Sequence, residues 1–426
     1  MKDFKSVGKS INRKDALDKL TGAAQYPQDM EMPDMIYGHT VRSKIASGTF
    51  VMDVSEAEAC EGVVTILSAK DVTGHNHHGV VFKDHDVFSK GRIHRVGDPI
   101  ALVVAETELL AIAAASKIKI EYTELPGVFD PEEAMKPDAP CVHEGVPNLI
   151  YHYKCRRGDV DKAFEEAHVI IEKTYHTPFA DHAFLQLESG LAYMEKDGRV
   201  MVKASTQYPH FDRLEVAEAI GCDEEKVIID NPAVGGSFGG REDLTLQAHL
   251  ALAAIKTGRP VKISYTREES FYAHSKRHPI KIEIKTAADA SGKLTACKAT
   301  LYGDSGAYTS WAINVMRKAG VHITGPYEIP NVHVDSYAVY TNNPFAGAMR
   351  GFGATQVPVA YEQQMDLVAE ALKMSPYEIR MKNLLRQGSM TANGQVLISP
   401  VPLETCLNTI WEAMSETEVV SDDQKR

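Results

Sequence analysis

Apolar residues in this chain fall into two kinds of run, short continuous or alternating segments and longer segments with helical periodicity. The short runs predict strands at residues 63–67, 101–104, 169–171, 226–229, 261–265 and 280–284. The longer runs predict helices at residues 106–116, 159–167, 211–220, 244–256 and 357–372. Because both kinds of element are spread along the chain, the pattern predicts an α+β fold.

A polar, proline-containing stretch interrupts this pattern between residues 130 and 148. Proline and clustered polar residues are typical of connections rather than of helices or strands. We therefore expect a linker at residues 131–150, which separates a first domain at residues 1–130 from a second at residues 151–426. With 44% hydrophobic residues in 426, the chain is long enough for both domains to hold cores.

The most informative segment is a glycine-rich loop at residues 235–240, Gly-Gly-Ser-Phe-Gly-Gly, which Arg241 and Glu242 follow. Glycine lacks a Cβ, so such a loop can adopt positive φ values and bring peptide N–H groups against a ligand. The helix predicted after it favours an anion-binding loop, since the first N–H groups of a helix are unpaired. A tight turn that packs a helix against a strand explains the glycines equally well. The spacing matches neither the P-loop nor the dinucleotide-binding fingerprint.

A second segment combines glycines with an aromatic residue at residues 347–356, Gly-Ala-Met-Arg-Gly-Phe-Gly-Ala-Thr-Gln, again before a predicted helix. A guanidinium at Arg350 is suited to hydrogen-bonding a cofactor, and a ring at Phe352 is suited to facing a planar ligand. Taken alone, Phe352 is more simply explained as a core residue. The presence of two such loops in one chain favours ligand binding.

Charge and cysteine usage narrow the class of protein. A net charge of −12 and a pI near 5.8 argue against nucleic acid or an anionic membrane as a partner. The N-terminal residues carry no apolar segment, so we expect no signal peptide and a cytoplasmic location. The six cysteines form no Cys-x-x-Cys pair and therefore indicate neither an iron–sulfur nor a zinc motif.

The two glycine loops resemble the molybdopterin-binding loops of the xanthine dehydrogenase and aldehyde oxidase family. Further similar segments occur in the order that the family shows. Those in the first predicted domain resemble the family's α/β hammerhead domain and lie at residues 15–26, 41–43, 96–105 and 120–126. Those in the second lie at residues 158–167, 182–188 and 204–207. The resemblance implies an α+β fold in which a hammerhead domain precedes the first half of a molybdopterin-binding domain.

The resemblance also implies roles around a molybdenum that the pterin holds, with no direct protein ligand. Gln207 matches a glutamine whose amide hydrogen-bonds an oxo ligand of the metal, and Arg350 matches an arginine beside the metal centre. Catalytic roles are therefore expected for these two residues. Backbone N–H groups of Phe238 and Gly239 are expected to approach the oxo ligand and the pterin. The full cofactor-binding set implied is Gln207, Gly236, Phe238, Gly239, Gly240 and Arg350.

Three residues are implied in substrate binding. Phe352 matches an aromatic residue that meets the substrate ring, and Glu242 matches a glutamate that hydrogen-bonds the heterocycle in purine-oxidising relatives. A Glu242 carboxylate would repel a substrate carboxylate unless the acid is protonated or the substrate is turned. Lys318 falls at the place of an assisting arginine, with Arg317 adjacent, and a solvated surface charge is an equally simple interpretation of either.

The similarity ends before the family's second pterin-binding half, which carries a glutamate general base. We therefore expect a complete chain that forms part of a divided molybdenum subunit, with the base glutamate in a partner chain, as in nicotinate-oxidising members of the family. A truncated piece of a longer subunit is the alternative. The implied reaction hydroxylates an electron-poor N-heterocycle with oxygen from water, nicotinate to 6-hydroxynicotinate. Electrons would pass through Fe–S clusters and FAD to NADP.

The implied cofactor is a molybdopterin dinucleotide in its cytosine form, with oxygen, sulfur or selenium as terminal ligand. The implied partners are a second molybdopterin subunit, a small subunit with two 2Fe–2S clusters and an FAD subunit, assembled as a dimer of heterotetramers. One alternative keeps the chemistry but oxidises a purine or an aldehyde. Another is a noncatalytic scaffold or maturation protein, against which the presence of Gln207, Phe238, Arg350 and Phe352 argues.

Overall fold

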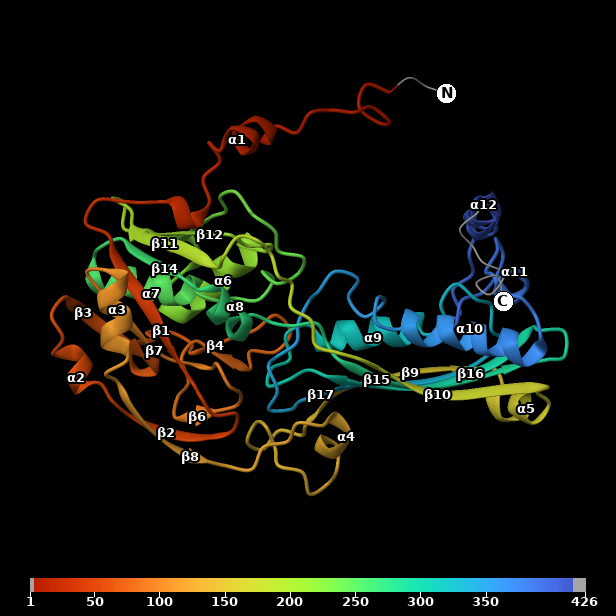
Figure 1. Ribbon diagram of the computed structural model, residues 1–426. Helices are drawn as coiled ribbons and strands as arrows, with labels where there is room; N and C mark the ends of the chain where they lie inside the picture. The colour runs from red at the N-terminus through yellow and green to blue at the C-terminus, as the bar shows by residue number, and fades with distance from the viewer. Residues whose placement is uncertain (1–3, 417–426) are drawn as a thin grey trace.

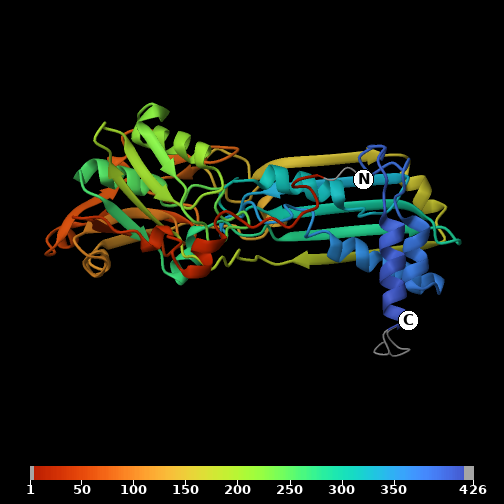
Figure 2. The same cartoon turned by 90° about the horizontal axis from the view of Figure 1, so that it is seen from above.

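The structure is a computed structural model that describes residues 4–416, and it has two lobes side by side (Figure 1). The first lobe is a broad α/β body, and the second is a long sheet with helices on both faces. Seen from above, the strands of the second lobe run along the length of the molecule (Figure 2). Strands and helices are present throughout, which confirms the predicted α+β class.

The strands of the first lobe are β1 (Ile36–Arg42), β2 (Gly48–Asp53), β3 (Val63–Ser68), β4 (His77–His78), β5 (His85–Asp86), β6 (Arg92–Ile93), β7 (Pro99–Ala105), β8 (Lys119–Glu124), β11 (Ser189–Met194), β12 (Val200–Ala204), β13 (Val227–Asp230) and β14 (Val261–Ser264). Those of the second lobe are β9 (Leu149–Arg157), β10 (Val169–Thr177), β15 (Ile280–Ala288), β16 (Leu294–Asp304) and β17 (Asn331–Val339). The helices are α1 (Ala16–Thr21), α2 (Ser55–Glu58), α3 (Glu108–Ala115), α4 (Pro131–Ala134), α5 (Val160–Glu165), α6 (Pro209–Ile220), α7 (Gln247–Thr257), α8 (Arg267–Ala273), α9 (Ala312–His322), α10 (Pro358–Leu372), α11 (Pro376–Asn383) and α12 (Leu403–Glu416). Short 3-10 turns are η1 (Pro27–Asp29), η2 (Ala69–Asp71) and η3 (Glu224–Lys226).

The main sheet of the first lobe has seven strands in the order β13-β12-β11-β14-β1-β7-β3. Every residue of its strand β7 is buried, as expected for the continuous apolar run that the sequence shows there. Strand β1 pairs with β14 in parallel, with Ile36 opposite Val261. Segments from before and after the predicted linker therefore share one sheet and one hydrophobic core.

The second lobe is built on a five-stranded sheet in the order β10-β15-β16-β17-β9. Along β15 the apolar residues Ile280, Ile282 and Ile284 are buried, and the charged residues between them are partly exposed. This alternation is expected for a sheet with one face on a core. Helices α9 and α10 cover the apolar face, and α4 and α5 lie on the other (Figure 1).

The predicted linker is a packed connection. It contains α4. Asp130 caps the N-terminus of this helix, because its side chain accepts hydrogen bonds from the N–H groups of Glu132 and Glu133. Val128, Ala134 and Val142 are buried in a cluster with Tyr308 and Phe345 of the second lobe. The proline and polar residues of this stretch thus mark a change of direction in the chain rather than a free tether.

The predicted helix at residues 244–256 is present but begins at Gln247. The Gln247 side chain explains the later start, because its Oε1 accepts hydrogen bonds from the N–H groups of Thr245 and Leu246. The helix start is therefore closed by the chain itself. Within residues 4–416, no helix combines the length and the apolar character needed to cross a bilayer.

Candidate functional site

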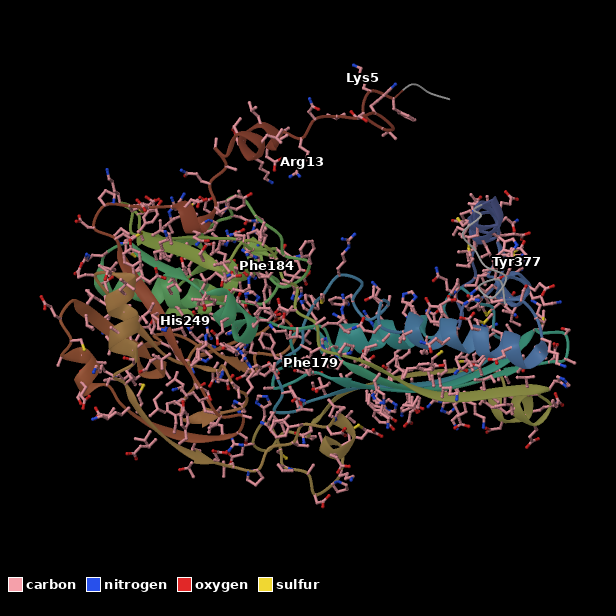
Figure 3. The ribbon with its side chains drawn as sticks, viewed as in Figure 1. Lys5, Arg13, Phe179, Phe184, His249 and Tyr377 are labelled. Atoms are coloured by element: carbon pink, nitrogen blue, oxygen red, sulfur yellow. The ribbon has the colours of Figure 1, made fainter. Side chains whose placement is uncertain are left out.

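The two glycine loops meet where the lobes join. The first loop connects β13 to α7, and the second connects β17 to α10. The segment from β10 to β11 crosses between the lobes at the same place, and its residues Phe179 and Phe184 mark the junction in Figure 3. Loops that extend from packed sheets are a common location for binding groups, because the sheets hold them in position.

The contacts between the loops run through backbone atoms. The N–H of Arg350 donates to the carbonyl of Phe238 at 2.9 Å. His182 Nε2 donates to the carbonyl of Ala348 at 2.7 Å, so this nitrogen carries the proton. Gly239 lies against the same carbonyl, since a Cβ built on it would be 2.6 Å from the oxygen of Ala348. Only a glycine allows this approach.

Both aromatic residues of the motifs adopt the left-handed backbone conformation, with φ of 53° at Phe238 and 55° at Phe352. A glycine with positive φ follows each, Gly239 at 104° and Gly353 at 94°. Such a conformation costs a non-glycine residue about 1 kcal/mol or more, so the surrounding structure must impose it. The two loops therefore repeat one strained turn, which is typical of functional segments.

Gln207 follows β12 and lies beneath the first loop. Its Oε1 accepts hydrogen bonds from the N–H groups of Gly239 at 2.8 Å and Arg241 at 3.4 Å. This fixes the orientation of the amide, because the oxygen must face those donors. The Nε2 group points the other way, where the nearest acceptor is Glu242 Oε1 at 3.4 Å. The Nε2 group of Gln207 can therefore still donate a hydrogen bond to a ligand.

The N–H of Gly239 does not have its expected role, because it donates to Gln207 and is not free for a cofactor. The free N–H groups belong to the three residues that precede Gly239. Among the described residues, none accepts a hydrogen bond from the N–H groups of Gly236, Ser237 or Phe238. Successive free N–H groups form a concave site for anionic oxygen. The exposed Arg350 guanidinium likewise has no hydrogen bond or ion pair to a residue in 4–416.

The remaining glycines of the first loop are sterically required. A Cβ on Gly240 would lie 2.9 Å from the ring of His182, and one on Gly236 would lie 3.0 Å from Phe184 Cβ. Gly236 also has a φ of 103°. The tight-turn interpretation of these glycines is confirmed, since the loop packs closely on one side. The N–H groups of residues 236–238 have no acceptor among the described residues, which leaves them available to a ligand.

A buried ion pair directly follows the first loop and links it to the segment that leads into β11. Arg241 and Glu188 are each about 1% exposed, with 3.7 Å between Nε and Oε2. The guanidinium also lies 4.3 Å from the centre of the Phe184 ring and donates to the carbonyl of Gln186. Burial raises the pKa of Glu188, although Arg241 opposes the shift. The family resemblance implied no role for this pair.

Arg277 holds the second loop in a similar way. Its guanidinium donates to the carbonyl of Arg350 at 3.0 Å and to Thr355 Oγ1 at 2.8 Å. These two acceptors flank Phe352, so Arg277 fixes the turn that carries the ring. Neither periodicity nor the glycine motif indicated this residue, because its partners lie more than 70 residues away in sequence.

The structure brings most of the expected site residues together but places Lys318 on its own. Gln207, Gly239 and Glu242 are in direct contact, and Arg350 is joined to Phe238. Burial raises the pKa of Glu242. Lys318 is exposed on α9, and it has no hydrogen bond or ion pair to any residue that the structure describes. Within residues 4–416, no group of three or more His, Cys, Asp or Glu side chains is arranged to hold a metal ion.

Asp243 is a buried acid next to the site, and replacing it with asparagine should change the pH dependence of stability. Burial raises its pKa from 3.8 to about 7, so folding retains a proton that the unfolded chain releases. The contribution of this acid to the free energy of unfolding therefore falls as pH rises from about 4 to 7, and it stays constant above pH 7. The stability of Asp243→Asn relative to wild type should rise by about 1 kcal/mol per pH unit in that window. Urea unfolding at several pH values measures this, and a difference that does not vary with pH would contradict it.

Comparison with known proteins identifies the family. The molybdopterin cofactor-binding domain matches residues 142–384, and the aldehyde oxidase and xanthine dehydrogenase a/b hammerhead domain matches residues 21–126. The chain is 41% identical to the nicotinate dehydrogenase large molybdopterin subunit of Eubacterium barkeri, over 97% of this chain and 98% of that subunit.

Two further similar proteins are longer. The chain is 40% identical to a probable xanthine dehydrogenase subunit of Bacillus subtilis, over 87% of this chain and 50% of that protein. It superposes on the solved aldehyde oxidoreductase of Desulfovibrio desulfuricans with a TM-score of 0.92 and 30% identity, over 96% of this chain and 47% of that one. The chain thus spans about half the length of these two proteins. On the matches over both of its parts, the chain belongs to the aldehyde oxidase and xanthine dehydrogenase family, with the hammerhead domain followed by a molybdopterin cofactor-binding domain.

Proposed function

We propose that this chain is the molybdopterin-binding large subunit of a multi-subunit molybdenum hydroxylase that converts nicotinate to 6-hydroxynicotinate. The junction of the two glycine loops supports the chemistry, because it gathers the Gln207 amide, free backbone N–H groups and an unpaired guanidinium. The similarity to a nicotinate dehydrogenase subunit over nearly the whole of both chains supports the substrate.

The residues present fit an anionic, oxygen-rich cofactor. The N–H groups of Gly236, Ser237 and Phe238 would donate to it, and the Arg350 guanidinium would balance its charge. We propose the cytosine dinucleotide form of molybdopterin, with sulfur or selenium as the terminal ligand of molybdenum. When bound, this cofactor supplies two-electron redox chemistry and transfer of an oxygen that comes from water.

The proposed roles of the side chains follow from their orientation. Gln207 Nε2 would donate a hydrogen bond to an oxygen of the bound cofactor, and a neutral amide does so without titrating. Phe352 meets the substrate ring, and Glu242 positions the heterocycle. Burial raises the pKa of Glu242, which makes the acid easier to protonate, and protonation would remove its repulsion of a substrate carboxylate. A glutamate from a partner chain acts as the general base.

The proposed complex is a cytoplasmic dimer of heterotetramers. Its other chains are a second molybdopterin subunit, a small subunit with two 2Fe–2S clusters and an FAD subunit, which pass electrons to NADP. A purine is the second candidate substrate, since Glu242 lies beside Gln207 and a probable xanthine dehydrogenase subunit is 40% identical to this chain.

Purification of the native complex through this chain tests the proposal. The expected result is stoichiometric molybdenum, a second pterin-binding chain, a cluster protein and a flavoprotein, with turnover of nicotinate above that of xanthine, hypoxanthine and aldehydes. Preference for a purine would show that the proposed substrate is wrong and that the proposed hydroxylation is right. A chain without metal or partners would refute the proposal and favour a scaffold.

Lys318→Ala should raise the KM of the complex for nicotinate by up to about fivefold at low ionic strength, and by less in high salt. Lys318 lies on α9 within one turn of Val315 and Ala319, the residues whose backbone Gly353 of the second loop approaches, and its charge acts on His322 of the same helix. Arg317→Ala is the matched control, because this neighbouring exposed cation lies near Tyr153 instead. Equal KM changes in both variants, or the same change for neutral nicotinamide, would show that Lys318 does not guide the carboxylate.

A further inference from the structure

Three aromatic side chains from separate parts of the chain form a row beside Gln207. Tyr208 follows β12, Trp311 precedes α9, and Phe352 lies in the second loop. The ring centres of Tyr208 and Trp311 are 6.1 Å apart, with 55° between the planes. Those of Trp311 and Phe352 are 5.6 Å apart and meet edge to face at 65°. These are favourable separations for aromatic pairs, so the three rings support one another.

Trp311 is the middle member of the row, and its backbone is held firmly. The preceding residue, Ser310, has a φ of 39°, which is unusual for a residue with a side chain. Its hydroxyl donates to Asp243 Oδ2 at 2.9 Å in a buried contact. A Cβ on Gly347 would lie 2.6 Å from that hydroxyl oxygen. The Trp311 ring is therefore positioned by both glycine loops at once.

The indole itself is held by ring contacts alone. Its Nε1 is buried and has no hydrogen-bond acceptor among the described residues. A substitution at Trp311 therefore breaks no hydrogen bond of the fold. It removes a bulky, partly buried ring from between Tyr208 and Phe352.

A polar corner adjoins one end of the row. Tyr208 follows Gln207 directly, and burial together with the nearby Glu242 carboxyl raises the pKa of the Tyr208 hydroxyl. Glu242 in turn accepts from Gln207 Nε2. A flat ring bound here would meet aromatic surface along its body and hydrogen-bonding groups along one edge, which is the arrangement that selects small aromatic heterocycles.

We infer that Trp311 and Tyr208 complete the aromatic surface begun by Phe352 and limit the substrate to a single flat heteroaromatic ring. The second ring of a bicyclic substrate would need the space that the Trp311 indole occupies. This inference rests on the proposed function and deepens it, because it concerns the size of the substrate at the same site.

The test compares nicotinate with isoquinoline-4-carboxylate, which adds a fused ring to the same carboxylated pyridine and keeps a hydrogen on the carbon that corresponds to C6 of nicotinate. In Trp311→Leu, the ratio of kcat/KM for the one-ring substrate to that for the two-ring substrate should fall at least tenfold, which corresponds to one lost aromatic contact and the space it leaves. Most of the change should appear in KM, with molybdenum content as in wild type. Calorimetric dissociation constants of the two ligands, measured on the complex, should shift in the same direction.

The chain contains a matched control, since it has only two tryptophans. Trp411 lies on α12 and stacks on Tyr377 at 4.9 Å, and Trp411→Leu should leave the ratio unchanged. Trp311→Phe should give an intermediate ratio. An unchanged ratio in Trp311→Leu, with molybdenum retained and nicotinate still oxidised, would overturn the inference while leaving the proposed function intact. A wild-type complex that oxidises only non-aromatic aldehydes would overturn both.

Discussion

Gly239→Val should deprive the complex of molybdenum while most of the chain stays folded. The position has two constraints that valine violates. Its φ of 104° disfavours a β-branched residue, and its Cβ would lie 2.6 Å from the carbonyl oxygen of Ala348. Either the turn changes or the loops separate, and both outcomes move the N–H that orients Gln207. We expect molybdenum content to fall about tenfold or more, as for the loss of an outer residue that orients a metal site.

The control for this variant is another glycine with positive φ. Gly198 has a φ of 82°, and a Cβ built on it would have no atom within 4 Å. Gly198→Val therefore carries the backbone cost, about 1 to 2 kcal/mol, without the steric clash. Metal analysis and circular dichroism of the two purified complexes separate the effects. Equal molybdenum content in both variants would mean that the contact between the loops is not needed for cofactor binding.

The regular parts of this fold follow from local patterns. The alternation of Ile280, Ile282 and Ile284 predicts β15 because every second residue of a strand faces the same side. Pro358 starts α10 near the predicted position, since proline is favoured in the first turn of a helix. Gly258 ends α7 in the left-handed conformation that helix ends prefer. Each of these signals acts over a few residues, so the sequence is sufficient to detect it.

The arrangement of the site depends on contacts that no local pattern encodes. The bond between Asp243 and Ser310 joins residues 67 positions apart, and it sets the place of Trp311. The glycines around Phe238 and Phe352 permitted positive φ values, but the Phe residues themselves take the left-handed conformation because the meeting loops impose it. The resemblance to the family supplied the candidates Gln207 and Arg350. It did not indicate that the N–H of Gly239 would donate a hydrogen bond to Gln207.

Arg241→Met should lower the free energy of unfolding by about 3 to 5 kcal/mol, because it leaves Glu188 buried without its cation. Both side chains are about 1% exposed, so water cannot replace the lost partner. The surface pair of Arg259 with Glu106 provides a matched comparison, since these side chains are 33% and 47% exposed. Arg259→Met should cost less than about 1 kcal/mol. Urea unfolding of the full chain measures both changes.

The pH dependence of the Arg241→Met effect identifies its cause. Without the guanidinium, the folded-state pKa of Glu188, which burial already raises, rises further above the unfolded value of 4.5. The carboxyl then destabilises the folded chain increasingly as pH rises from about 5 towards that folded pKa, so the deficit should be larger at pH 8 than at pH 5. Adding Glu188→Gln should recover much of the lost stability and remove the pH dependence, because a neutral amide leaves no buried charge. The loss of unfolding free energy could instead be the same at both pH values and persist in the double variant. It would then come from the missing contacts of Arg241 with Phe184 and Gln186. The Arg241–Glu188 pair would then act through packing rather than through charge, as expected where a guanidinium covers an aromatic face.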